Sequence, residues 1–172
     1  MSKAFTRESD DLPDLPPPPS RAPLLPLGVK NYMTPAGQRR LQKELDRLIQ
    51  FDRPRLAALA TGDDGKRELH ALDQRLHHLH QSLESAVVVT PPAASEERVR
   101  FGATVAVRDA KGNESKYRIV GVDETDLDRN WISWLSPIAK ALVNARLKQR
   151  VRFKFPAGEE ELEIVRINYE AF

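Results

Sequence analysis

Cysteine is absent from the 172-residue chain, which excludes disulfide bonds and metal sites built from thiolates. The chain also lacks any run of about 18 apolar residues, the length that can span a membrane. Its start, MSKAFTRESDDLPDL, lacks the apolar stretch of a secretory signal. We therefore expect a soluble protein of the cytoplasm. A net charge of only +2 does not by itself indicate a nucleic-acid partner.

Proline is concentrated near the N-terminus, where residues 15–26 read LPPPPSRAPLLP. Proline has no backbone donor, and it disfavours helix in the residue before it. We expect residues 1–30 to form a proline-rich disordered tail. A ligand for a polyproline-binding domain is the alternative interpretation of the same composition.

Two apolar stripes at helical spacing follow the tail. The first begins at Thr34-Pro35, a capping residue and a proline suited to a helix start, and Pro54 should kink it. Its apolar positions are Leu41, Leu45, Leu48, Ile49, Leu56, Leu59 and Ala60. Those of the second stripe are Leu69, Leu72, Leu76, Leu79, Leu83 and Ala86. Only TGDDG at 61–65 separates the stripes, so we predict an antiparallel coiled-coil hairpin over residues 31–89 with this turn at its tip.

A second unit is expected over residues 96–172, after a linker rich in proline and alanine. Residues 99–124 form two alternating runs around a Lys-Gly-Asn turn, which predicts two antiparallel strands. Residues 130–134 predict another strand, and Ser136-Pro137 begins a short helix. Residues 151–172 predict two more strands around a Pro-Ala-Gly turn. The fold class is therefore α+β: a helical hairpin followed by a small antiparallel β-rich domain with a short helix.

Several stretches, in order and at compatible spacing, resemble the Gre transcript cleavage factors of bacteria, and GreB more than GreA. They are KNYMTPAGQRRLQKELDRL at 30–48, RP at 53–54, FGATV at 101–105, YRIVGVDE at 117–124, ISWLSP at 132–137 and PAG at 156–158. The resemblance covers nearly everything from Lys30 to Tyr169. It implies a coiled-coil finger and a C-terminal domain similar in fold to FK506-binding proteins.

The resemblance also implies a function and a partner, the core RNA polymerase. In the Gre family the C-terminal domain docks on the rim of the polymerase secondary channel, and the finger inserts toward the active site. Acidic residues at the fingertip help hold a second Mg²⁺, so that the polymerase itself hydrolyses the RNA of a backtracked complex. Carboxylates suit this role because Mg²⁺ prefers oxygen ligands and a second metal activates the attacking water. Asp63 and Asp64 are the candidate fingertip carboxylates here, with Mg²⁺ shared with the polymerase.

The tip departs from the pattern of the family it resembles. Gly62-Asp63 matches the family's Gly-Asp, but no Ser-Glu-Asn follows it. About a dozen residues are missing across the tip, which at 1.5 Å per helical residue shortens the finger by roughly 10 Å. We therefore expect weak or lost transcript cleavage and a protein that is non-catalytic by itself, lending at most acidic residues to the polymerase. An active GreB-type cleavage factor is the alternative.

The docking loop carries a second departure. Leu135, Ser136 and Pro137 occupy the region that meets the polymerase rim in the Gre family. Family members often carry an acidic residue where this chain has Leu135, which exchanges a charge for apolar surface. Ser136 and Pro137 also have a local explanation, because Ser followed by Pro starts a helix well.

Three other interpretations remain open. Turn chemistry alone explains Asp63 and Asp64, since Asp caps a helix and favours its positive end. An FK506-binding-protein-like domain also suggests a peptidyl-prolyl isomerase module, although no dense aromatic pocket is evident. A relative of the regulator of nucleoside diphosphate kinase is a third reading, which the GreB-like stretch at 30–48 argues against.

Four histidines gather on the second stripe: His70, His77, His78 and His80. They could form a surface metal site, but without a third firm ligand a solvated helix face is favoured. Trp131 and Trp134 fall on opposite faces of the strand expected at 130–134. One of them should therefore lie in the core and the other be at least partly exposed.

The first stripe also carries four basic residues: Arg39, Arg40, Lys43 and Arg47. They could contact nascent RNA or DNA indirectly within a polymerase complex. Because Glu44 and Asp46 are interleaved with them, a solvated helix face explains them equally well. We expect the protein to be a monomer whose leucine seams pair within one chain.

Overall fold

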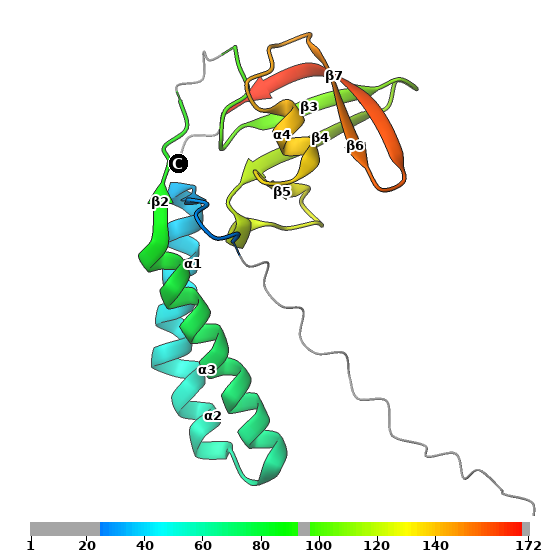
Figure 1. Cartoon of the computed structure of the whole chain (residues 1–172). Coiled ribbons are helices and arrows are strands. Elements are labelled where there is room, and N and C mark those ends of the chain that lie inside the picture. The colour runs from blue at the N-terminus through cyan, green and yellow to red at the C-terminus, as the bar shows by residue number, and fades with distance from the viewer. Residues whose placement is uncertain (1–24, 93–96, 170–172) are drawn as a thin grey trace, which may run out of the picture.

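The computed structural model describes residues 25–92 and 97–169, and every structural statement below concerns those residues. Most of the tail predicted at 1–30 lies outside them. A long pair of helical arms carries a β-rich part at one end (Figure 1). Within the described segments, no helix is both long enough and apolar enough to cross a membrane.

The first helical arm is one uninterrupted helix with a local change of geometry. Its elements are α1 (Pro35–Arg47), the π-helical turn η1 (Leu48–Asp52) and α2 (Arg53–Leu59). The predicted start is confirmed, because Thr34 is the N-cap and its side chain accepts a hydrogen bond from the Gly37 amide at 2.9 Å. The π-helical turn directly precedes Pro54, which has no N–H to bond to the carbonyl four residues earlier.

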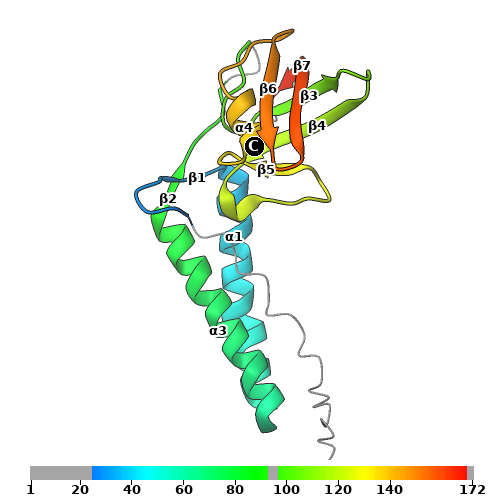
Figure 2. The same cartoon turned by 45° about the vertical axis from the view of Figure 1, so that its right-hand side comes forward.

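The second arm, α3 (Gly62–Ser85), runs back beside the first (Figure 2). The buried residues between them are Met33, Leu41, Leu45, Leu76 and Leu79. Two ion pairs join the arms at their rims, Glu44 to Arg75 at 2.7 Å and Arg53 to Asp73 at 2.7 Å. The predicted helical N-terminal region is therefore confirmed, with apolar packing at its base and charged pairs along its sides.

The apolar seam between the arms does not continue to the tip. Ile49 and Leu59 are exposed, although their spacing predicted that both would face the second arm. The prediction is wrong for these two residues. Ile49 lies within η1, which closes hydrogen bonds over five residues, and Leu59 follows it, after the α-helical register has shifted. No residue of α2 is fully buried.

The β-rich part is a five-stranded sheet in the order β5-β4-β3-β7-β6. Its strands are β3 (Thr104–Asp109), β4 (Glu114–Val120), β5 (Trp131–Ser133), β6 (Arg150–Phe155) and β7 (Gly158–Asn168). The short helix α4 (Pro137–Leu142) packs on the sheet through Ala139 and Leu142, both fully buried. The predicted α+β class is confirmed.

The expectation of a purely antiparallel sheet is wrong at one edge. β5 pairs with β4 in parallel, with Arg118 opposite Trp131 and Val120 opposite Ser133. The chain leaves β4 through the 3₁₀ turn η2 (Val122–Glu124) and an irregular loop, which returns it to the level of Arg118 before β5 begins. Alternation of apolar residues indicates a strand but does not encode the direction of its neighbour.

A second, two-stranded sheet was not predicted. β1 (Asn31–Met33) and β2 (Ala86–Val88) pair in parallel at the base of the helical arms. The β-branched residues near Val88 did predict extended backbone there. The partner strand becomes adjacent only because the two arms return the chain to its starting point.

The β3–β4 turn supports a prediction about acid stability. The Asp109 carboxylate accepts hydrogen bonds from the Asn113 side chain at 2.9 Å and from the Asn113 and Lys111 amides at 2.8 Å, and these lower the pKa of Asp109. A carboxyl with a lowered folded-state pKa stabilises the fold above its unfolded pKa, near 4, and loses that contribution as the pH falls through the folded value.

Asp109→Asn is therefore expected to flatten the loss of stability at acid pH. The measurement is the free energy of unfolding in urea at pH 6 and at pH 3, compared with the exposed control Asp128→Asn. The parent and the control should lose more stability between the two pH values than Asp109→Asn does. Equal losses in all three proteins would contradict the role assigned to this turn.

Candidate functional site

The turn at the tip is shorter than predicted. The five residues at 61–65 were expected to form it, but α3 already begins at Gly62, so only Ala60 and Thr61 lie between the helices. Gly62 has a φ of +82°, a conformation that favours glycine. A Cβ at Gly65 would lie 2.7 Å from the Ala60 Cα, closer than real Cβ atoms approach. The two glycines therefore permit the tight reversal.

Asp63 and Asp64 lie in the first turn of α3 and are exposed. Asp64 forms an ion pair with Arg67 at 3.5 Å, and its side chain is 95% exposed. Both carboxylates stand where the helix dipole favours negative charge. Within the part of the chain that the structure describes, no three acidic, histidine or cysteine side chains gather as a metal site. A metal ion at this tip would need most of its ligands from a partner.

The candidate docking loop connects β5 to α4. Ser136 is the N-cap of α4, and its side chain accepts a hydrogen bond from the Ala139 amide at 3.2 Å, as its sequence context predicted. The Leu135 amide donates to the Ser133 hydroxyl at 3.1 Å. Leu135 is half-buried and Pro137 is exposed. The three residues therefore form an ordered loop that presents an apolar side chain and a proline at the surface.

Ser136→Ala is expected to lower the free energy of unfolding by about 1 kcal/mol, because it removes the N-cap acceptor of α4. Ser136→Asn is the matched control, since Asn caps helices as well as Ser does. Urea unfolding monitored by tryptophan fluorescence measures both variants. An equal loss in the two variants would show that the cap hydrogen bond is not the cause.

The junction between the arms and the β-rich part contains contacts that the sequence did not predict. His78 was assigned to a solvated helix face, which is wrong, because its Nε2 lies 2.9 Å from an Asp123 carboxylate oxygen. The adjacent Glu124 accepts a hydrogen bond from the Thr34 amide at 2.8 Å. Asp123 and Glu124 end the YRIVGVDE stretch, but local sequence contains no signal that they reach the helical arms.

Both tryptophans lie at this junction. The Trp134 ring packs against Tyr32, with centroids 5.0 Å apart. Trp131 is surrounded by three guanidinium groups, from Arg40, Arg118 and Arg129, at 5.4, 4.9 and 5.4 Å from its centroid. Both side chains are half-buried, and of the two only Trp134 packs against the core of the β-rich part, so the expected difference between them holds in part. The Trp131 ring contacts α1 through Arg40, and the Trp134 ring contacts β1 through Tyr32.

The predicted basic face of the first arm is partly paired. Arg47 forms an ion pair with Asp52 at 3.1 Å. Arg39 and Lys43, with two glutamines, line a shallow hollow of about 350 Å³. This surface can meet an anionic partner, but its geometry does not distinguish that role from a solvated helix face.

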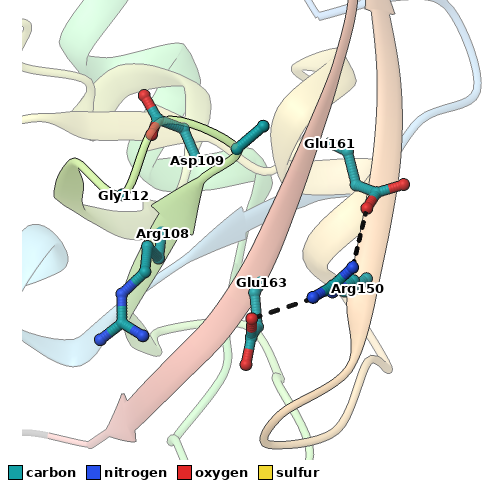
Figure 3. Close-up of a pocket in the computed structure, with 7 residues that line it drawn as sticks. Arg108, Asp109, Gly112, Arg150, Glu161 and Glu163 are labelled. Carbon is teal, nitrogen blue, oxygen red and sulfur yellow. Dashed lines mark ion pairs between the residues drawn. The ribbon is translucent and has the colours of Figure 1, made fainter.

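The β-rich part contains a hollow of about 340 Å³ beside the β3–β4 turn (Figure 3). Charged side chains line it, including Arg108 and Asp109. Arg150 crosses it and forms ion pairs with Glu161 at 3.6 Å and Glu163 at 3.8 Å. Peptidyl-prolyl isomerase chemistry needs an apolar, aromatic-lined pocket for proline, and this hollow does not provide one.

Comparison with known proteins identifies relatives. The family described as "Transcription elongation factor, GreA/GreB, C-term" matches residues 94–169. Transcription elongation factor GreB of Neisseria meningitidis is 40% identical over 155 residues, covering 82% of this chain and 95% of that protein. GreB of Pseudomonas aeruginosa is 40% identical over 150 residues, covering 80% and 89%. GreA of Thermodesulfovibrio yellowstonii is 36% identical over 152 residues, covering 80% and 96%.

A solved structure is also similar, that of the prokaryotic transcription elongation factor GreA/GreB from Nitrosomonas europaea. It is 22% identical, covers 81% of this chain and 100% of its own, and has a TM-score of 0.40. The alignment with the Neisseria protein has 155 positions but covers 82% of 172 residues, about 141. About 14 of its positions therefore have no counterpart in this chain.

These relatives correct one expectation and show to which family the chain belongs. A non-catalytic protein was expected, which is wrong, because the relatives are GreB and GreA proteins. The role of that family is to stimulate transcript cleavage, even though the chemistry takes place in the polymerase. The identities are above 30% and cover at least 80% of this chain and most of each relative. This chain belongs to the GreA/GreB family of transcription elongation factors and resembles GreB most.

Proposed function

We propose that the protein binds bacterial RNA polymerase in the cytoplasm and stimulates the cleavage of backtracked transcripts weakly. The β-rich domain, residues 96–172, adopts an FK506-binding-protein-like fold and docks on the rim of the secondary channel. Residues 31–89 act as a coiled-coil finger that inserts into the channel. The observation that carries this proposal is the 40% identity to GreB over 95% of that protein.

The weak cleavage follows from the length of the finger. α3 contains 24 residues and spans about 36 Å from its tip to its base. We place the positions missing relative to the Neisseria protein in the two antiparallel arms, because the tip departs from the family pattern, and they then correspond to roughly 10 Å of reach. Coordination of a metal ion tolerates errors of only about 0.2 Å. Asp63 and Asp64 would therefore stop short of the catalytic Mg²⁺ and assist it less than a full-length tip does.

The docking surface that we assign is the loop containing Leu135, Ser136 and Pro137. The Ser136 cap orders this loop, and the half-buried Leu135 and exposed Pro137 give it an apolar face. An apolar contact at the centre of an interface excludes water and is suited to a partner of complementary shape. The protein acts as a monomer in this proposal, with any Mg²⁺ held jointly with the polymerase.

Two measurements on the same protein test the proposal. Affinity capture of core RNA polymerase, with and without a competing GreB, should show binding that the competitor removes. Stalled, backtracked complexes should then show RNA cleavage above the rate of polymerase alone but well below the rate with GreB. Absence of polymerase binding would reject the whole proposal.

The tip residues need their own variant. Asp63→Asn combined with Asp64→Asn keeps the size of both side chains and removes both charges. We expect this variant to bind polymerase as the parent does and to lose the remaining cleavage stimulation. The parent protein could instead stimulate cleavage at the rate of GreB, and the double substitution could abolish that stimulation. In that case the protein is an ordinary GreB-type cleavage factor, and the shorter finger does not weaken cleavage.

A further inference from the structure

Two neighbouring acidic residues of the β-rich domain each hold a different helical arm. Asp123 and Glu124 lie in η2, the short 3₁₀ turn after β4. Asp123 contacts α3, and Glu124 contacts the start of α1. We propose that Asp123 and Glu124 form a clasp that fixes the direction of the finger relative to the docking domain. The consequence for cleavage rests on the proposed function, whereas the clasp itself does not.

The Glu124 half of the clasp is fully buried, with 1% of the residue exposed. Its carboxylate accepts hydrogen bonds from the Thr34 amide at 2.8 Å, the Gly121 amide at 3.0 Å and the Thr34 hydroxyl. A buried carboxylate is costly unless donors of this kind surround it. Two of its three donors belong to Thr34, on the other side of the junction. Separating the two parts would therefore leave the charge without most of its partners.

Thr34 links this contact to the helix that it begins. Its hydroxyl oxygen accepts the hydrogen bond from the Gly37 amide at 2.9 Å while the same hydroxyl donates to Glu124. A Cβ at Gly37 would overlap the Glu124 side chain, so glycine is required for this approach. The Thr-x-x-Gly spacing at 34–37 thus serves both as a helix start and as the receptor for a carboxylate from the β-rich domain.

The Asp123 half of the clasp holds the second arm. One carboxylate oxygen lies 2.9 Å from His78 Nε2, and the other accepts the Ser82 hydroxyl. The Asp123 side chain is 8% exposed. Ser82 is tied in turn to β1, because the Asn31 side-chain amide donates to its carbonyl at 3.0 Å. Asp123 therefore contacts the end of α3 that is also hydrogen-bonded to β1.

The Asp123 and Glu124 contacts hold two different arms, so together they fix the angle between the finger and the docking domain. A single contact would allow the finger to tilt about it. The aromatic contacts at the junction, between Trp134 and Tyr32 and between Trp131 and Arg40, include no hydrogen bond to α3. With an arm of about 36 Å, a tilt of about 10° at the junction moves the tip by roughly 6 Å. A displacement of that size is far larger than metal coordination or in-line attack permits.

Distances in the free protein test the clasp without any polymerase. Because the chain has no cysteine, Arg67→Cys near the tip and Lys111→Cys in the β3–β4 turn accept a unique pair of spin labels. Both positions are exposed. Pulsed EPR on the otherwise unchanged full chain should give one narrow distance distribution. Asp123→Asn combined with Glu124→Gln should broaden it or shift it by several ångströms.

Matched controls separate the clasp from a general change of charge. Asp128→Asn combined with Glu84→Gln makes the same chemical changes at exposed positions and should leave the distribution unchanged. Thr34→Val removes the hydroxyl that donates to Glu124 and that also caps α1, whereas Thr34→Ser keeps both hydrogen bonds, so only the first should broaden the distribution. These two variants also decide the question if the double variant fails to fold. An unchanged distribution in folded clasp variants would overturn the proposal.

A second readout connects the clasp to the proposed function. The clasp variants should still capture core polymerase, because the docking loop is untouched. Their cleavage stimulation should fall by about tenfold or more, as misplaced catalytic groups generally cause. If the parent does not bind polymerase, the proposed function fails while the EPR result still decides the clasp. Broadened distances with full cleavage activity would show that cleavage does not depend on the direction that the clasp gives the finger, and would overturn this consequence of the proposal.

Discussion

A finger lengthened by seven residues in each arm is expected to stimulate transcript cleavage at least about tenfold more strongly than the parent, because misplaced catalytic groups cost this much or more. One insertion lies between Ala57 and Ala58, and the other between Lys66 and Arg67. Seven residues add about 10 Å of helix, and a whole heptad keeps apolar positions facing the partner helix. The tip itself, including Asp63 and Asp64, stays intact. Backtracked complexes stalled at one template position provide the measurement.

Two controls show whether reach is the cause. Asp63→Asn with Asp64→Asn in the lengthened protein should abolish the gain and lower cleavage to the rate of polymerase alone, because the longer finger then brings no carboxylate to the active site. An insertion in only one arm should give no gain, since it shifts the two helices out of register. If the properly lengthened finger captures polymerase but cleaves no faster than the parent, the weak-cleavage proposal loses its physical basis.

The sequence predicted the parts of this fold that local chemistry determines. Thr34 before Pro35 and Ser136 before Pro137 each marked a helix start, because a capping oxygen and a preset φ act within one turn. The spacing of Leu41, Leu45, Leu76 and Leu79 predicted the buried faces of the two arms. The same reasoning overestimated the length of the turn at the tip, because Asp and Gly occur both in loops and in the first turn of a helix.

Long-range geometry accounts for most of what the sequence did not predict. The parallel pairing of β5 and the approach of His78 to Asp123 join segments that meet only in the finished fold. Glu124 is buried although glutamate is rarely buried, and only one of its three donors, the Gly121 amide, comes from a neighbour in sequence. The π-helical turn before Pro54 was predicted only in part. Proline indicates that the helix is distorted at this point, but it does not specify whether the distortion is a kink or a π-helical turn. The sequence placed Asp63 and Asp64 between the two arms, where the structure has them, but it did not predict the contacts between the arms and the β-rich domain.

Leu79→Ala is expected to lower the free energy of unfolding by about 2–5 kcal/mol, the range for deleting a large buried side chain. Leu79 is 1% exposed and belongs to a core of only five buried residues between the arms. So few residues leave little surrounding structure to collapse around the cavity. A loss of this size is a large fraction of the stability of an ordinary domain.

The same substitution at Leu59 is the sharpest comparison, because the two leucines belong to stripes that look equivalent in sequence. Leu59 is 66% exposed at the end of α2, so Leu59→Ala should change the free energy of unfolding by less than about 0.5 kcal/mol. Urea unfolding followed by far-ultraviolet circular dichroism measures both variants through the helices that they affect. Similar losses would mean that the tip half of the finger is packed as tightly as its base. The large difference that we expect would instead show that the apolar core of the finger lies at its base, next to the clasp. The tip would then depend on ion pairs and on contact with the polymerase for its order.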